Sequence, residues 1–207
     1  MKMKQFEEVK GIYDGILKNI NGYGASFVEK QQKISNKYEK DLIYGEVPLE
    51  LLYALFVLEP TKSYLAGRKI FYDLGSGVGN ILIGSYLIGN FEKYIGIELL
   101  DSLYNLSLEA RKNLCAIDKK AENSLFFKHG NILDFNIGDG DVLFFCCPNR
   151  EQKIMQEMEK KFLDTKRGAL IFSLIHAFED DRNFNMLDSS MVKTTWGQAP
   201  LRVYERV

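Results

Sequence analysis

This sequence has few of the residue types that hold disulfide-rich or metal-stabilised folds together. Of its 207 residues only three are cysteine and two are histidine. Three cysteines do not make a disulfide framework, and without a spaced Cys/His cluster we expect no metal site. Cys146 and Cys147 are adjacent in an apolar run, a position typical of a buried strand in a reducing compartment. The sequence therefore predicts a cytoplasmic location.

The sequence also lacks an excess of one charge and a long apolar run. Lys plus Arg number 27 and Asp plus Glu 28, a net charge of −1 that argues against an overall basic nucleic-acid binder. The longest apolar run, Leu51–Leu58, has eight residues, whereas a membrane-spanning helix needs about 20. The first eight residues contain lysine but no apolar segment follows them, so no signal peptide is expected. We expect a soluble globular protein with no membrane partner.

Hydrophobic periodicity divides the chain into two regions. In residues 1–43 the apolar positions 9, 12, 16 and 20 share one face of a helix, and Asn21–Gly24 interrupts it. A second polar helix is expected from about Ser26 to Lys40. We interpret residues 1–43 as a helical N-terminal extension or lid, and residues 44–207 as the main domain.

From Leu65 onward, short β-rich runs alternate with helical stretches. This alternation predicts a parallel sheet of right-handed βαβ units, with strands at 69–74, 93–99, 125–128, 141–147 and 169–175. The connection over 130–140 is too short for an ordinary crossover helix. Two last runs, Met191–Trp196 and Leu201–Val207, flank Gly197–Pro200 and predict a terminal hairpin. The resulting α/β, Rossmann-like plan, a mostly parallel seven-stranded sheet ending in an antiparallel hairpin, resembles that of class I methyltransferases.

The strongest local pattern is the turn that leads from Asp73 through Gly75, Gly77 and Gly79 to Asn80. It follows an apolar strand and opens a helix, and its glycines let the backbone turn sharply and approach a ligand. The spacing differs from the G-x-G-x-x-G of dinucleotide binders. Asp73 would repel a pyrophosphate but suits a ligand with a charged amino group, such as S-adenosylmethionine (SAM). We expect these five residues to bind SAM.

Two later strand ends extend this site. Glu98 ends the next strand, 25 residues after Asp73, and an acidic residue about 20 residues beyond a glycine loop accepts hydrogen bonds from ribose hydroxyls. Enzymes that bind NAD use the same device, so an NAD(P)-dependent oxidoreductase stays an alternative that the glycine spacing disfavours. After the third strand, Asn131 is expected to hydrogen-bond the adenine and Ile132 to pack on its face.

Several motifs occur together in an order typical of one family. Tyr44-Gly45-Glu46-Val47 precedes an apolar helix and the Asp73–Asn80 loop, and Gly96-Ile97-Glu98, Gly130-Asn131 and Thr195–Pro200 follow. Over about residues 40–207 the chain resembles the disruptor-of-telomeric-silencing family, the non-SET histone-lysine methyltransferases. The family has Thr where this chain has Val47, and Asn-Asn after the fourth strand where this chain has Cys146-Cys147-Pro148-Asn149.

The resemblance implies a role for each motif. Tyr44 and Glu46 would fold over the methionine end of SAM, with Glu46 facing its amino group. Trp196 would line a narrow channel for an acceptor lysine, and Asn149 is the candidate to replace the family's Asn-Asn pair. Asn149 and Trp196 are therefore the catalytic candidates, SAM is the cofactor, and the partner is a protein with an accessible lysine.

Methyl transfer from SAM mainly requires donor and acceptor to be oriented, so neither histidine is assigned as a base. Two alternatives keep the same fold. The acceptor can be RNA or a small molecule, or the chain can be a noncatalytic SAM-binding scaffold subunit, because a fold does not fix a function.

Overall fold

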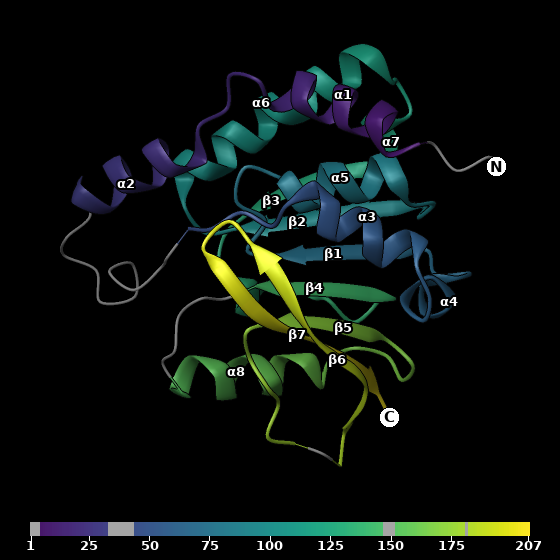
Figure 1. The fold of residues 1–207 in the computed structure, drawn as a ribbon. Helices are drawn as coiled ribbons and strands as arrows, with labels where there is room; N and C mark the ends of the chain where they lie inside the picture. The colour runs from purple at the N-terminus through teal and green to yellow at the C-terminus, as the bar shows by residue number, and fades with distance from the viewer. Residues whose placement is uncertain (1–4, 33–43, 147–151, 181) are drawn as a thin grey trace.

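The computed structural model describes residues 5–32, 44–146, 152–180 and 182–207. This part of the chain forms a seven-stranded sheet with the order β3-β2-β1-β4-β5-β7-β6, flanked by helices (Figure 1). The strands are β1 Ile70–Leu74, β2 Lys93–Glu98, β3 Leu125–His129, β4 Val142–Cys146, β5 Leu170–Leu174, β6 Phe184–Thr194 and β7 Gly197–Arg206. Strands β1 to β5 pair in parallel, whereas β7 is antiparallel to both β5 and β6. The predicted sheet is confirmed.

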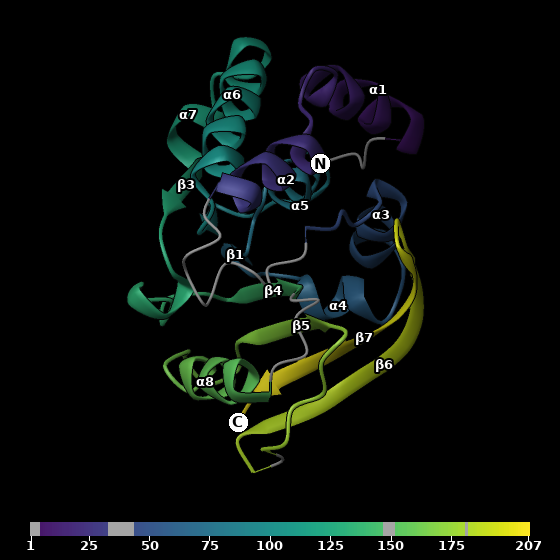
Figure 2. The same cartoon turned by 90° about the vertical axis from the view of Figure 1, so that its left-hand side faces the viewer.

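Helices cover both faces of the sheet (Figure 2). They are α1 Phe6–Leu17, α2 Gly22–Gln32, α3 Leu49–Val57, α4 Thr61–Leu65, α5 Asn80–Ile88, α6 Asp101–Ile117, α7 Ala121–Ser124 and α8 Gln152–Phe162. Neighbouring residues on one strand point to opposite faces: Phe144 packs with α1, α3 and α5, while Phe145 packs with α8. Because both faces are covered, the central strands are almost entirely apolar.

The N-terminal helices α1 and α2 pack on helices α5 and α6 at one face of the sheet (Figure 1). Helix α1 buries Val9, Tyr13 and Ile16 in the same cluster as the buried residues of α5. The division of the chain at residues 43 and 44 stays a prediction. None of the described helices is long and apolar enough to cross a bilayer.

Helix α2 begins earlier than the sequence suggested. Asn21 was expected to interrupt the helical region, but its side-chain oxygen accepts a hydrogen bond from Gly24 N at 2.9 Å. Asn is a favourable residue at a helix N-terminus because it satisfies such a donor. The helix therefore starts at Gly22 rather than Ser26, and its expected extension to Lys40 lies outside the described residues.

The terminal hairpin turns at Thr195 and Trp196, not at Gly197–Pro200 as expected. Thr194 pairs with Gly197 at the end of the ladder, and Thr194 Oγ1 also donates to Gly197 O at 2.7 Å. Pro200 lies inside β7 opposite Met191. The strand tolerates this proline because the residues of β7 that pair with β5 begin only at the next position, Leu201.

The short connection between β3 and β4 holds a single 3₁₀ turn, η1 Ile132–Asp134, in place of a crossover helix. Asn131 caps this turn by accepting a hydrogen bond from Leu133 N at 3.0 Å. The connection therefore begins at the carboxyl edge of the sheet and then crosses to the amino edge, where Asp141 Oδ2 accepts from Ile70 N at 2.9 Å.

Candidate functional site

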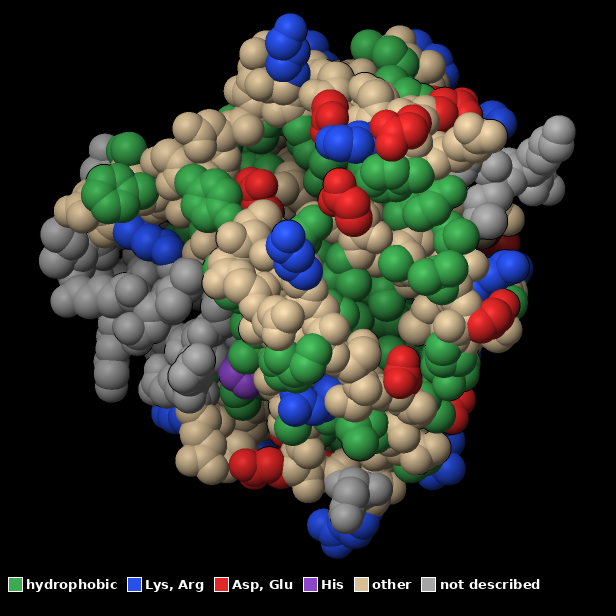
Figure 3. Space-filling view, in the orientation of Figure 1, with side chains coloured by type: hydrophobic (Ala, Val, Ile, Leu, Met, Phe, Trp, Pro, Cys, Tyr) green, Lys and Arg blue, Asp and Glu red, His purple; other side chains and the backbone are tan. Residues whose placement is uncertain are grey.

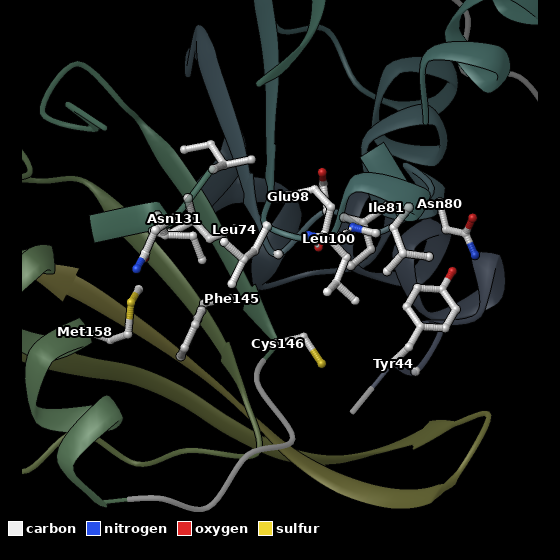
Figure 4. Close-up of a pocket in the computed structure, with 18 of the residues that line it drawn as sticks. Tyr44, Leu74, Asn80, Ile81, Glu98, Leu100, Asn131, Phe145, Cys146 and Met158 are labelled. Carbon is white, nitrogen blue, oxygen red and sulfur yellow. Dashed lines mark hydrogen bonds between the residues drawn. The ribbon is translucent and has the colours of Figure 1, made fainter. Parts of the chain in front are cut away.

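A cavity of about 410 Å³ lies at the carboxyl ends of β1, β2 and β4 (Figure 4). The strand order reverses between β1 and β4, and ligands of α/β sheets bind in the crevice at such a point. The structure brings together most of the residues proposed from the sequence. Eight of them line the cavity: Tyr44, Glu46, Gly75, Gly77, Asn80, Glu98, Asn131 and Ile132.

Four of the proposed residues do not appear in that lining. Asp73 lies beneath the glycine loop, Gly79 caps the N-terminus of α5, and Trp196 lies at the hairpin turn. Asn149 lies outside the described residues, so its catalytic role stays a prediction. Trp196 is 40% exposed and is therefore not a core residue.

We term the glycine loop Gly75–Gly79 and the buried Asp73 beneath it the floor of the cavity; Asp73 itself lies below the lining residues. Its side chain is 1% exposed, and its Oδ2 atom has no hydrogen-bond partner. Burial, together with the nearby Glu98 carboxylate, raises the pKa of Asp73 well above its ordinary value. A buried carboxylate without a partner is costly. The site therefore suits a ligand that brings a cationic donor to this oxygen.

Glu98 connects two loops at the rim of the sheet. Its side chain is 7% exposed; Oε2 accepts from Gly77 N at 2.7 Å and Oε1 accepts from Leu100 N at 2.8 Å. Burial raises the pKa of Glu98, although these backbone donors act in the opposite direction. A carboxylate has about four acceptor positions, so Glu98 can hold the glycine loop and still accept hydrogen bonds from a diol.

The glycines of the loop are required by close packing as well as by backbone shape. Gly77 has φ +53°, and a Cβ atom there would lie 2.6 Å from Cε2 of Tyr44. Gly79 has φ +93°, and its Cβ would lie 2.6 Å from Cζ of Phe127. The lack of a side chain at Gly77 thus leaves room for Tyr44, and the lack of one at Gly79 leaves room for Phe127 of β3.

Residues 44–47, which we term the cover, line the cavity beside the glycine loop, where Tyr44 packs against Gly77. Tyr44 lies at the same end as Asn80 in Figure 4. Its hydroxyl donates to Glu46 Oε1 at 2.8 Å, and its ring meets that of Tyr23 edge to face with centroids 5.0 Å apart. Burial and the Glu46 carboxylate both raise the pKa of Tyr44. Tyr44 therefore acts here as a neutral hydrogen-bond donor.

The opposite end of the cavity differs in part from the prediction. Asn131 uses Oδ1 to cap η1, so its amide nitrogen, which points toward Met158 in Figure 4, is the group that faces the cavity. Phe145, Cys146, Ile154 and Glu157 also line the cavity, and sequence reasoning did not identify them. The sequence feature that could have identified Phe145 and Cys146 as cavity residues is their position at the carboxyl end of a central strand. The helical spacing in α8 indicated only core packing.

The charged residues among the described cavity lining are all acidic. Glu46, Glu98 and Glu157 line the cavity, and no Lys, Arg or His occurs among the lining residues that the structure describes. On the face shown in Figure 3, basic and acidic side chains are interspersed and do not form a patch of one sign. The cavity therefore favours cationic groups and disfavours phosphate.

Comparisons with known proteins agree with this geometry. The family model described as "Histone methylation protein DOT1" matches residues 23–205. A histone-lysine N-methyltransferase specific for H3 lysine 79, from Gibberella zeae, is 25% identical over 167 residues, covering 75% of this chain and 33% of that protein. The chain thus spans about a third of that relative's length.

Two solved structures share the fold. A candidate RNA methyltransferase from Pyrococcus horikoshii superimposes with a TM-score of 0.63, 14% identity and 98% coverage of both chains. An RNA methyltransferase from Salinibacter ruber, in complex with S-adenosyl-L-homocysteine, gives a TM-score of 0.55 and 18% identity over 78% of this chain and 93% of that one. The chain has the seven-stranded sheet of class I SAM-dependent methyltransferases, and the family model matches most of its length. This chain therefore belongs to the DOT1 histone methylation protein family.

Proposed function

We propose that the protein is a SAM-dependent methyltransferase that transfers a methyl group to the side-chain amine of a protein lysine. The observation that carries the proposal is an acidic cavity above an unpartnered buried carboxylate, Asp73. Family membership supports methyl transfer, and the sign of the charge supports an amine acceptor.

The residues of the cavity fit SAM. Asp73 Oδ2 lacks a partner and Glu46 lines the cavity, so these two carboxylates are the candidates to hold the ammonium group at the methionine end. Glu98 faces the cavity, where the hydroxyls of a ribose diol would donate hydrogen bonds to its remaining lone pairs. The apolar end at Ile132 and Phe145 suits the flat face of a purine. When bound, SAM supplies a methyl group on a positively charged sulfur that leaves readily.

The protein's own task is then to orient and desolvate the acceptor. Orientation of two reactants can contribute about 7–11 kcal/mol. A lysine amine must also lose its proton, which costs roughly 4–5 kcal/mol at pH 7 for a pKa of about 10.4. Burial against Trp196 and Tyr44 would lower this cost by disfavouring the ammonium form. Since no histidine is found among the described lining residues, the amine proton would pass to solvent before transfer.

Ligand binding tests the cofactor. We expect SAM at 100 times its Kd to stabilise the folded chain by about 2.7 kcal/mol. Thermal unfolding with SAM, S-adenosylhomocysteine and NADH, each at the same concentration, measures this effect. A shift with NADH and none with SAM would contradict the proposal and favour an oxidoreductase.

Acceptor mapping tests the substrate. The chain is incubated with methyl-labelled SAM and separate protein, RNA and metabolite fractions, including intact nucleosomes. We expect label in protein, located at lysine by peptide mapping. Label in RNA or in a small molecule would instead support the alternative acceptors on the same fold. SAM binding without transfer to any fraction would support a scaffold subunit.

A further inference from the structure

The side chain of Thr195 hydrogen-bonds the cover to the C-terminal hairpin. Thr195 Oγ1 donates to Glu46 O at 2.9 Å and accepts from Glu46 N at 3.4 Å, across 149 residues of sequence. One hydroxyl thus engages both backbone polar groups of Glu46, much as a paired strand would. The orientation of the Glu46 side chain depends on this contact because its backbone is held on both sides.

The Thr195 hydroxyl also forms a hydrogen bond with a residue of α2. Tyr23 Oη lies 3.0 Å from Thr195 Oγ1. A threonine hydroxyl has one donor and two acceptor positions. Since the donor is used on Glu46 O, Tyr23 is the donor in the third bond. Tyr23 in turn meets the Tyr44 ring, and Tyr44 donates to Glu46 Oε1, so the four residues form a closed ring of contacts.

The next residue of the turn supports the same arrangement by packing. A Cβ atom on Gly45 would lie 2.6 Å from Cε3 and Cζ3 of Trp196, so the indole lies directly on the backbone of Gly45. Thr195 itself is exposed, and the turn has its own closing bond from Thr194 Oγ1 to Gly197 O. Loss of the Thr195 hydroxyl should therefore loosen the cover without opening the hairpin.

We propose that Thr195 is a positioning residue for the cofactor end of the cavity. It holds Glu46 toward the cavity and Tyr44 above Gly77, so that both are in place before a ligand arrives. The inference rests on the proposed function, because it assigns the ordered cover a part in SAM binding. Without the hydroxyl, binding must first order the cover, and the apparent affinity falls by the fraction of chains that are ordered.

Three variants test this role. Thr195→Val keeps the shape but removes every hydrogen bond, and Thr195→Ser keeps the hydroxyl. Thr165→Val is the matched control, because Thr165 Oγ1 also donates to a backbone oxygen, Phe162 O at 2.7 Å, far from the cover. Each variant is compared with wild type by calorimetric titration with SAM, by ligand-free thermal unfolding, and by steady-state kinetics with the mapped acceptor.

For Thr195→Val we expect the Kd and the KM for SAM to rise about tenfold, equivalent to 1.4 kcal/mol. Because saturating SAM restores the ordered cover, kcat should stay within about twofold of wild type. Thr195→Ser should bind SAM as wild type does. Thr165→Val should lower the unfolding midpoint and leave the Kd for SAM unchanged.

An unchanged Kd in Thr195→Val would overturn the inference, and so would an equal loss in Thr195→Ser or in Thr165→Val. A wild-type chain that does not bind SAM would overturn the proposed function itself. If wild type and Thr195→Val bind SAM with the same Kd, only the role of Thr195 is overturned.

Discussion

The floor and the cover of the cavity are built in different ways. The floor is set by backbone pairing: Asp73 is aligned with Gly96 in the β1–β2 ladder, and Gly75 N and Ser76 N both donate to Ile97 O at 2.9 Å. The cover is instead held by side chains from distant segments, with contacts that span 149 and 172 residues. The floor is therefore rigid and locally encoded, whereas the cover depends on a few replaceable contacts. The largest loss of SAM binding is therefore expected from a substitution at Asp73, and smaller losses are expected at the cover and at its contact with the floor.

The largest effect is expected at Asp73. In Asp73→Asn the charge that faces the ligand is lost, and a hydrogen bond to a charged group is worth about 1.5–3 kcal/mol, so the Kd for SAM should rise roughly 10- to 100-fold. The ligand-free chain should become more stable by about 1 kcal/mol, because an uncompensated buried carboxylate is removed. Calorimetric titration and urea unfolding measure the two changes. Unaltered SAM affinity with lower stability would show that Asp73 is only structural.

The next effect is expected at Gly77, where floor and cover touch. Gly77→Ala introduces left-handed strain and places a methyl group 2.6 Å from the Tyr44 ring. Gly67→Ala is the matched control, since Gly67 has φ +76° but nothing within 4 Å of its Cβ. Both variants should lose about 1–2 kcal/mol of stability through strain. Only Gly77→Ala should also raise the Kd for SAM, by about tenfold, as titration of both variants would measure.

Equal SAM affinities in the two alanine variants would contradict the contact between floor and cover. A larger loss of stability in Gly67→Ala than in Gly77→Ala would do so too, because only Gly77 has a neighbour that must move.

The same division explains what the sequence could predict. The start of a helix at Asn80, the loop from Asp73 to Asn80 and the position of Glu98 follow from local spacing, and the structure has them as expected. These features depend on strand ends and glycine conformations that neighbouring residues determine. A sequence pattern alone is therefore enough to place the floor.

The cover and the far end of the cavity could not be predicted in this way. The hydroxyl of Thr195 reaches the cover, and the α8 side chains reach the cavity, only through the tertiary fold, and periodicity within one segment does not encode such contacts. The hairpin turn was misplaced because Gly197 and Pro200 are typical turn residues, yet the ladder continues through both. Tertiary pairing overrode the local preference there.

A smaller effect is expected where the cover meets Trp196. In Gly45→Ala a methyl group would lie 2.6 Å from the indole, which must move. Because Trp196 is 40% exposed, it can yield at little cost in stability. We expect kcat/KM for the acceptor to fall about fivefold, less than the roughly 100-fold that a 1 Å misplacement can cause. Gly11→Ala, with open space at its Cβ, is the control and should leave the kinetics unchanged. An unchanged kcat/KM in Gly45→Ala would remove Trp196 from the acceptor site.

The last prediction concerns the pH dependence of stability, in which Asp73 and Asp141 contribute with opposite signs. The folded-state pKa values of Asp73 and Glu98 are raised above their ordinary values of about 4. The folded chain thus binds more protons than the unfolded chain between the ordinary and the raised values, and ligand-free stability falls as pH rises through that window. Asp141 has a lowered pKa and contributes with the opposite sign, losing stability as pH falls.

The contribution of Asp73 is therefore measured as the difference between wild type and Asp73→Asn in urea unfolding at a series of pH values from about 4 upward. We expect the stability of wild type relative to Asp73→Asn to decrease as pH rises, by about 1.4 kcal/mol for each unit by which the pKa is raised. The affinity of wild type for SAM should change in the opposite direction, because the ionised carboxylate is the form that holds an ammonium group. If stability and affinity instead rose together with pH, Asp73 would already be ionised and paired in the ligand-free chain, and the floor would not be the acidic site that the structure indicates.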